Sequence, residues 1–139
     1  MAESPRRPLL MQILAALLTF YAMTGMWLAM TMVGSRDERF HWLPLIVGGV
    51  TFAIASGASA LAVWRMESRA PTVLIVCGII GAVLCVAMPA AVRGAVVTKN
   101  VWFSAIAGGL LFGAFLLLAA RYVSLYLRSL GAGAKPKAW

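Results

Sequence analysis

Three methionines lie on one face of the first long apolar stretch of this sequence: Met23, Met26 and Met30. Spacings of three and four residues place them on the same side of an α-helix. Thioether sulfur is a soft ligand that suits Cu(I), so this face is a weak candidate copper site. Methionine is also an adaptable packing residue. Because the sequence has a single histidine and no thiol near these methionines, we interpret them as packing residues.

Two cysteines could add soft ligands from a different stretch. Cys77 and Cys85 are eight residues apart, and Met88 follows them. In a helix, eight residues rise about 12 Å, which is too far for a disulfide between the two thiols. The spacing also matches neither a redox CxxC motif nor a zinc site. We therefore predict that both cysteines pack as small apolar side chains and that the protein has no resident metal or cofactor.

The four acidic residues and the single histidine lie outside the long apolar stretches. They are Glu3, Asp37, Glu38, Glu67 and His41. Proton-coupled transporters and ion pumps usually place such a group inside the membrane. A membrane enzyme needs a nucleophile with a base, a carboxylate cluster or a set of cofactor ligands. The sequence has none of these patterns, so we expect a protein that is not an enzyme.

The composition predicts an integral membrane protein. Of the 139 residues, 63% are hydrophobic and 12% are charged, and the mean hydropathy is +0.92. Soluble domains are about half apolar and about a quarter charged, so the solvent is lipid. The net charge of +8 would suggest nucleic acid as a partner of a soluble protein. Here the basic residues lie between apolar stretches and act as topology signals, so we expect a lipid bilayer and no nucleic acid as partner.

Four apolar stretches are long enough to cross a bilayer: residues 9–33, 43–64, 72–92 and 101–122. A hydrocarbon core of about 30 Å needs about 20 helical residues. Short connections join antiparallel neighbours. The sequence therefore predicts an all-α fold, one transmembrane domain over residues 1–139 whose helices run up-down-up-down. We expect Pro71 in the first turn of the third helix. Residues 123–139 form a basic tail, into which the fourth helix continues as far as Gly131-Ala132-Gly133.

The distribution of Lys and Arg predicts the orientation. Eight of the twelve lie in residues 1–8, 65–71 and 121–139, and the other four lie between the first and second stretches or between the third and fourth. Cytoplasmic segments carry the excess of positive charge. We therefore predict that both termini are cytoplasmic. The abundance of Ala, Arg and Gly suggests a bacterial inner (plasma) membrane.

Small residues recur at every fourth position of the second and fourth stretches: Gly49, Ala53, Gly57, Ala105, Gly109 and Gly113. In lipid, close packing of helices depends on small residues that let the backbones approach. The spacing does not decide whether these faces join helices of one chain or contact another chain. Our leading hypothesis is a non-catalytic membrane subunit or scaffold that packs through these faces against other membrane proteins or a second copy.

The alternative hypothesis is a small homo-oligomeric transporter or channel for a neutral or non-proton-coupled substrate. Pro89 cannot donate a hydrogen bond to the Cys85 carbonyl, so we expect a kink in the third helix there. Such a kink can expose backbone polar groups to a cavity. Neutral polar side chains would then line the path: Thr19, Tyr21, Thr24, Thr51, Ser56 and Ser59.

The second and fourth stretches also resemble each other at an offset of 60 residues. Six residues of the second stretch are identical to those 60 positions later: Trp42, Ile46, Gly48, Gly49, Phe52 and Ala60. The first and third stretches show no comparable match. We hypothesise that the two halves of the chain are copies in the same orientation.

Overall fold

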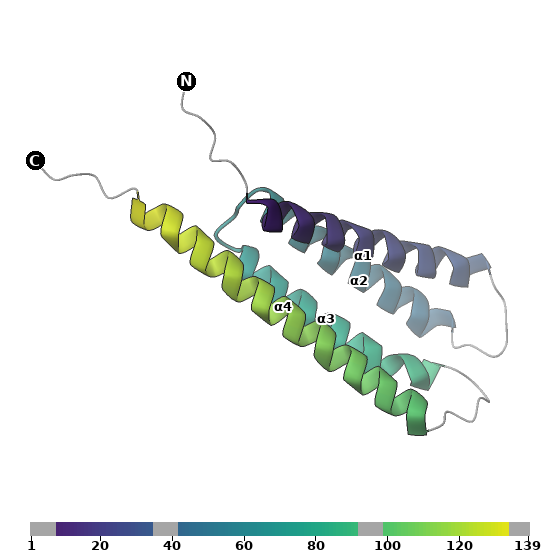
Figure 1. The fold of residues 1–139 in the computed structure, drawn as a ribbon. Coiled ribbons are helices and arrows are strands. Elements are labelled where there is room, and N and C mark those ends of the chain that lie inside the picture. The colour runs from purple at the N-terminus through teal and green to yellow at the C-terminus, as the bar shows by residue number, and fades with distance from the viewer. Residues whose placement is uncertain (1–7, 35–41, 92–98, 134–139) are drawn as a thin grey trace, which may run out of the picture.

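The computed structural model describes residues 8–34, 42–91 and 99–133. These residues form four long helices and one short 3₁₀ segment: α1 (Leu9–Gly34), α2 (Trp42–Trp64), α3 (Ala70–Ala87), η1 (Met88–Ala91) and α4 (Lys99–Gly133). The helices lie side by side in one elongated bundle (Figure 1). All four are long and apolar enough to cross a membrane, α3 together with η1, which confirms the predicted all-helical, membrane-spanning class.

The helix boundaries agree with the sequence in most places. The first two candidate spans, Leu9–Val33 and Leu43–Trp64, coincide with the predicted stretches, and the third, Ala70–Ala91, begins two residues early. Pro71 lies in the first turn of α3, as expected. Helix α4 is 35 residues long and ends at Gly133, which confirms its predicted continuation. At 1.5 Å per residue it is about 52 Å long, more than a hydrocarbon core of about 30 Å requires.

The turn between α2 and α3 closes α2 with a Schellman motif. The Glu67 N–H donates to the Ala62 carbonyl at 3.0 Å, and the Met66 N–H donates to the Val63 carbonyl at 3.1 Å. Met66 has a φ of 53°, in the left-handed region where glycine is usual. The motif satisfies the last carbonyls of α2 and lets α3 begin at Ala70.

The helices associate as two pairs, which we call the first pair (α1 and α2) and the second pair (α3 with η1, and α4). The most extensive contacts lie within these pairs, and α2 joins α3 less extensively. In Figure 1 the pairs lie close together at the end where α1 begins and α4 ends, and they diverge toward the other end. We call these the terminal end and the far end of the bundle.

The main apolar core fills the terminal half of the bundle. It takes side chains from all four helices, among them Leu14 and Leu18 of α1, Val63 of α2, Leu74 of α3 and Leu116 of α4. Leu18, Leu74 and Leu116 have no exposed surface. This core joins the two pairs where Figure 1 shows them close together.

The packing repeats at the same 60-residue offset as the sequence. Gly25 of α1 packs on Gly49 of α2, and Cys85 of α3 packs on Gly109 of α4. Buried positions in the first pair correspond to buried positions in the second: Leu14 and Leu74, Gly49 and Gly109, Ser56 and Leu116, Ala60 and Ala120, Val63 and Val123. The equivalence includes α1 and α3, whose sequences alone show no match. It supports the hypothesis that the chain contains two copies of one helix pair.

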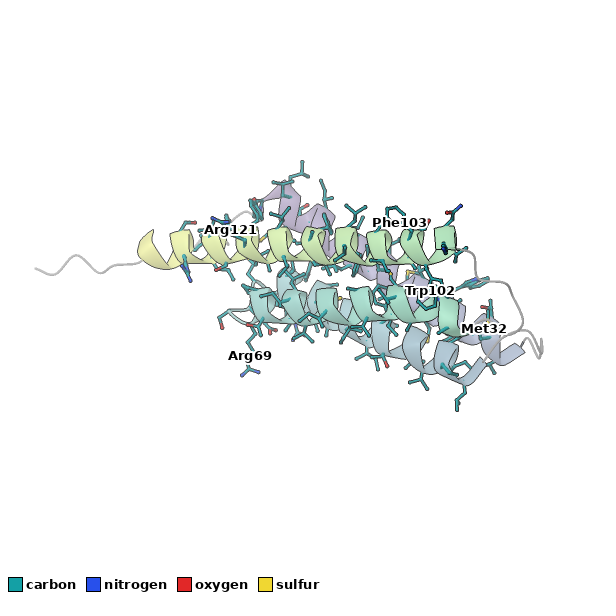
Figure 2. The ribbon with its side chains drawn as sticks, turned by 90° about the horizontal axis from the view of Figure 1, so that it is seen from below. Met32, Arg69, Trp102, Phe103 and Arg121 are labelled. Atoms are coloured by element: carbon teal, nitrogen blue, oxygen red, sulfur yellow. The ribbon has the colours of Figure 1, made fainter. Side chains whose placement is uncertain are left out.

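Basic and aromatic side chains mark the two ends of the bundle. Figure 2 shows Arg69 and Arg121 toward one end, and Met32, Trp102 and Phe103 toward the other. Arg65, Arg69 and Arg121 are exposed. Trp64 and Tyr122, beside Arg65 and Arg121 in the sequence, are exposed as well. Aromatic rings therefore lie toward both ends of the bundle, as expected at the two interfaces of a bilayer.

Candidate functional site

A cavity of about 230 Å³ lies between the two helix pairs, in the far half of the bundle. The first pair provides one wall, including Thr24, Gly48 and Phe52. The second pair provides the opposite wall, including Leu84 and Met88. The remaining lining residues are Gly25, Leu28, Pro44, Leu45, Gly49, Gly81, Cys85, Ala87 and Ala91. Most are small residues, so the cavity exists because few side chains project into the space between the pairs.

Phe52, which lines the cavity, belongs to a group of three aromatic rings at the level where the terminal half of the bundle begins. Tyr21 of α1 and Phe112 of α4 meet edge to face, with centroids 5.5 Å apart. Phe52 of α2 lies 6.2 Å from Tyr21 and 5.7 Å from Phe112. We call these three residues the aromatic layer. Edge-to-face and tilted pairs at such distances are favourable contacts between rings. The layer separates the cavity from the apolar core of the terminal half.

Gly81 is the residue of α3 that lies next to the aromatic layer. A Cβ atom added at Gly81 would overlap the Phe112 ring and would lie 3.1 Å from Cε2 of Phe52. Glycine is therefore needed for the rings to fit against α3. At the 60-residue offset, Gly81 corresponds to Tyr21. At this position the first pair therefore contributes a large ring to the layer and the second pair contributes no side chain.

The cavity offers almost no polar surface. The Thr24 hydroxyl donates to the Phe20 carbonyl of its own helix at 2.9 Å. Cys85 is the one other lining residue with a heteroatom of some polarity in its side chain, since Met88 brings only a thioether. Such a site can hold an apolar group by shape and dispersion. None of the lining residues in the described part of the chain is an acid, a base or a charged group.

The small-residue faces are used inside the chain. A Cβ atom added at Gly49 would lie 2.8 Å from the Gly25 carbonyl oxygen of α1, and Gly57 lies over Ala22 of α1. The buried Ala53 belongs to the same contact, with its backbone nitrogen 3.2 Å from a Cβ atom added at Gly25. The face of α2 that the sequence left unassigned therefore packs on α1.

The corresponding face of α4 packs on α3. A Cβ atom added at Gly109 would lie 3.0 Å from the Ala82 carbonyl oxygen, and one at Gly113 would lie 3.8 Å from the Ala82 Cβ atom. Ala105 is half-buried. By contrast, Gly108 has no atom within 4 Å of an added Cβ, so it faces outward. A hypothesis of partner binding through the two predicted faces must therefore move to a different surface.

The soft-ligand residues do not gather at one point. Met23 is 68% exposed and Met30 is 67% exposed, so the methionine face of α1 points away from the bundle. Cys77 is completely buried, with its sulfur 3.6 Å from the Ser56 hydroxyl. Cys85 lies at the cavity. Within residues 8–34, 42–91 and 99–133, no three His, Cys, Asp or Glu side chains come together as a metal site would require. Residues 35–41, which include His41 and Asp37, lie outside the described ranges.

The hydroxyl groups that a transport path would use are also dispersed. Thr19 and Thr51 are exposed, and each donates to the carbonyl four residues earlier, at 2.8 and 2.7 Å. Ser59 is buried between α2 and α3, where its hydroxyl lies 2.7 Å from the Ala55 carbonyl and 3.3 Å from the Val73 carbonyl. Of the six polar residues that the alternative hypothesis names, Thr24 alone lines the cavity.

Pro89 marks the point where the α-helix of the third span ends. The regular helix stops at Ala87, and Met88–Ala91 continues as a 3₁₀ turn in which Pro89 is buried. A 3₁₀ segment is a common way to tighten the last turn of a helix. Pro89 therefore lies in a 3₁₀ turn that follows α3, and the kink expected there stays a prediction. The turn lies at the far end, next to the cavity wall formed by Met88 and Ala91.

Comparisons with protein-family models, with curated proteins and with solved structures find no match to this chain.

Proposed function

We propose that this protein is a non-catalytic integral membrane subunit that binds another membrane protein through the outward face of α4. In this proposal the helices run up-down-up-down across a bacterial inner membrane, with both termini in the cytoplasm. The excess of Lys and Arg on the terminal side supports that orientation.

The observation that carries the proposal is the low coverage of α4. In the 18-residue apolar stretch of α4, 17% of the residues are buried, whereas in the corresponding stretch of α2 the buried share is 44%. Ser104 and Gly108 are four residues apart and both exposed, and the space above Gly108 is open. Leu111 is 73% exposed on the same side. Two small residues spaced four positions apart on one helix face permit the close approach of a second helix.

The absence of chemical machinery in the described spans supports a binding role. The candidate spans of α1, α2 and α3 contain no Asp, Glu, Lys, Arg or His. Helix α4 begins with Lys99 and has Arg121 and Arg128 among its last 13 residues. Within the described ranges, every buried side-chain nitrogen or oxygen has a hydrogen-bond partner.

Native mass spectrometry of the complex, released from its own membrane in a mild detergent, tests this proposal. We expect co-purification with a larger membrane protein at a fixed stoichiometry. Gly108→Leu should abolish that association. Ala58→Leu, a similar enlargement on the exposed face of α2, should leave it intact. Recovery of the wild-type protein only as a monomer or homo-oligomer would reject the subunit hypothesis.

A second candidate function, a small transporter for a neutral or non-proton-coupled substrate, draws support from the cavity, which reaches the middle of the bundle from one side. Transport would require the aromatic layer to open. Reconstitution into liposomes separates this candidate from the first: flux of a neutral solute to which protein-free liposomes are impermeable, if it is lost in Phe52→Trp, would favour transport. Identical leakage from wild-type and protein-free liposomes would exclude it for that solute.

A further inference from the structure

We propose that the cavity is a binding site for one acyl chain of a membrane lipid, taken from the bilayer leaflet at the far end of the bundle. The inference goes beyond the proposed subunit function, because it concerns a different surface and a different ligand. It rests on the depth of the cavity, its lining, its volume and the aromatic layer at its inner end.

The depth of the cavity matches one leaflet. Its lining on α2 runs from Pro44 to Phe52, eight residues apart, which corresponds to about 12 Å along the helix. Half of a hydrocarbon core is about 15 Å. Tyr21 is the middle residue of the 25-residue span Leu9–Val33, and Gly81 lies at the middle of the 22-residue span Ala70–Ala91. The aromatic layer therefore lies near the bilayer midplane, and the cavity occupies the leaflet at the far end of the bundle.

The lining selects a hydrocarbon over water. A buried water needs two to four polar partners, and apolar cavities without them stay dry. The Thr24 hydroxyl already donates to the Phe20 carbonyl. Leu28, Leu45 and Leu84 present only methyl and methylene groups. In a bilayer, the acyl chains of lipids are the abundant molecules with this chemistry, and they lie parallel to the helices that form the walls.

The volume admits one chain and excludes a whole lipid. An apolar cavity of about 150 Å³ accommodates a benzene ring, so the 230 Å³ found here takes a short hydrocarbon segment. The headgroup of the lipid then stays at the far surface. The aromatic layer prevents the methyl end from passing into the other half, where Leu18, Leu74 and Leu116 are fully packed.

Photolabelling of the whole protein in phosphatidylcholine vesicles tests the proposal. The probes are two phosphatidylcholines, one with a diazirine near the methyl end of an acyl chain and one with it near the carbonyl end. We expect the methyl-end probe to label Phe52 and Leu84. The carbonyl-end probe should label Pro44 and Met88.

Two variants fill the cavity from opposite walls: Gly48→Leu and Ala87→Leu. An added Cβ at Gly48 meets only the mobile end of Leu84, at 3.0 Å, and Ala87 is exposed at the rim, so the fold should tolerate both changes. Each should abolish labelling of Phe52. The matched control is Gly108→Leu, at the repeat-equivalent position of Gly48, where the added side chain meets open space. It should keep the label.

Three results would overturn the proposal: label confined to outward residues such as Leu110 and Leu111, label at Phe52 that persists in both cavity-filling variants, or label without any dependence on probe depth. The double comparison also separates this site from the proposed subunit function. Gly48→Leu should lose the lipid and keep the partner, and Gly108→Leu should lose the partner and keep the lipid. Failure of either proposal therefore leaves a distinct pattern.

Discussion

Replacement of Gly49 by alanine should force α1 and α2 apart. The added Cβ atom would lie 2.8 Å from the Gly25 carbonyl oxygen and 3.3 Å from the backbone nitrogen of Ala29. Both atoms belong to the α1 backbone, which cannot move aside as a side chain can. Overpacking of this kind costs about 1–3 kcal/mol. The better helix propensity of alanine returns at most about 1 kcal/mol. Because a 2.8 Å approach to backbone places the overpacking cost in the upper part of this range, about 2–3 kcal/mol, we expect a net loss of stability of about 1–2 kcal/mol.

Substitutions at two other glycines serve as comparisons for this prediction. At Gly109, the repeat-equivalent position, an added Cβ would lie 3.0 Å from the Ala82 carbonyl oxygen, so Gly109→Ala should cost less than Gly49→Ala. At Gly108 nothing lies within 4 Å, so Gly108→Ala should leave stability unchanged or raise it slightly. Unfolding by SDS in mixed micelles, followed by circular dichroism, measures all three. The reasoning fails if Gly108→Ala is as destabilised as Gly49→Ala, or if Gly49→Ala has no effect.

Four further predictions follow from particular contacts. Leu116→Ala should lose at least about 2 kcal/mol in the same assay, since Leu116 is fully buried, whereas its neighbour Leu117, 54% exposed, should tolerate alanine; equal losses would contradict the assigned core. Met66→Gly should be about 1 kcal/mol more stable than Met66→Ala, because both remove the long side chain and only glycine adopts the left-handed φ of 53° without strain. The reverse order of stability would show that Met66 is not strained. Gly81→Ala should weaken the near-ultraviolet circular dichroism of the aromatic layer, and an unchanged spectrum would count against the fit at Phe112. Elemental analysis after anaerobic purification should find no stoichiometric copper; copper that disappears in Met26→Leu would contradict the outward methionine face.

The spans were predictable because each is a local property of the sequence. A run of more than 20 apolar residues must be helical in lipid, and its flanking charges mark where it stops. The ends of the first two spans could therefore be predicted to the residue. Pro71 and the glycines near the end of α4 gave equally local signals. The Schellman turn gave no such signal in the sequence, because Met66 occupies the position where glycine is usual.

The cavity could not be predicted because it depends on how helices distant in sequence meet. The small residues of α2 and α4 indicate close packing, yet their spacing does not name the partner helix. The partners become evident only when Gly25 lies against Gly49 and Ala82 against Gly109. The aromatic layer at the inner end of the cavity depends on the contact of Tyr21 with Phe112 and on the room that Gly81 leaves for Phe112. The correspondence of Tyr21 with Gly81 at the 60-residue offset gains a meaning only after this packing is known.

The concentration of contacts within each helix pair has a consequence for biosynthesis. Since α1 contacts mainly α2, and α3 contacts mainly α4, each pair can form most of its own interactions as soon as its second helix has left the ribosome. Contacts between near neighbours in sequence close small loops and form quickly. The first pair can therefore fold in the membrane before the second is synthesised. Assembly then ends with a single docking event between two preformed halves, at the core that contains Leu74 and Val63.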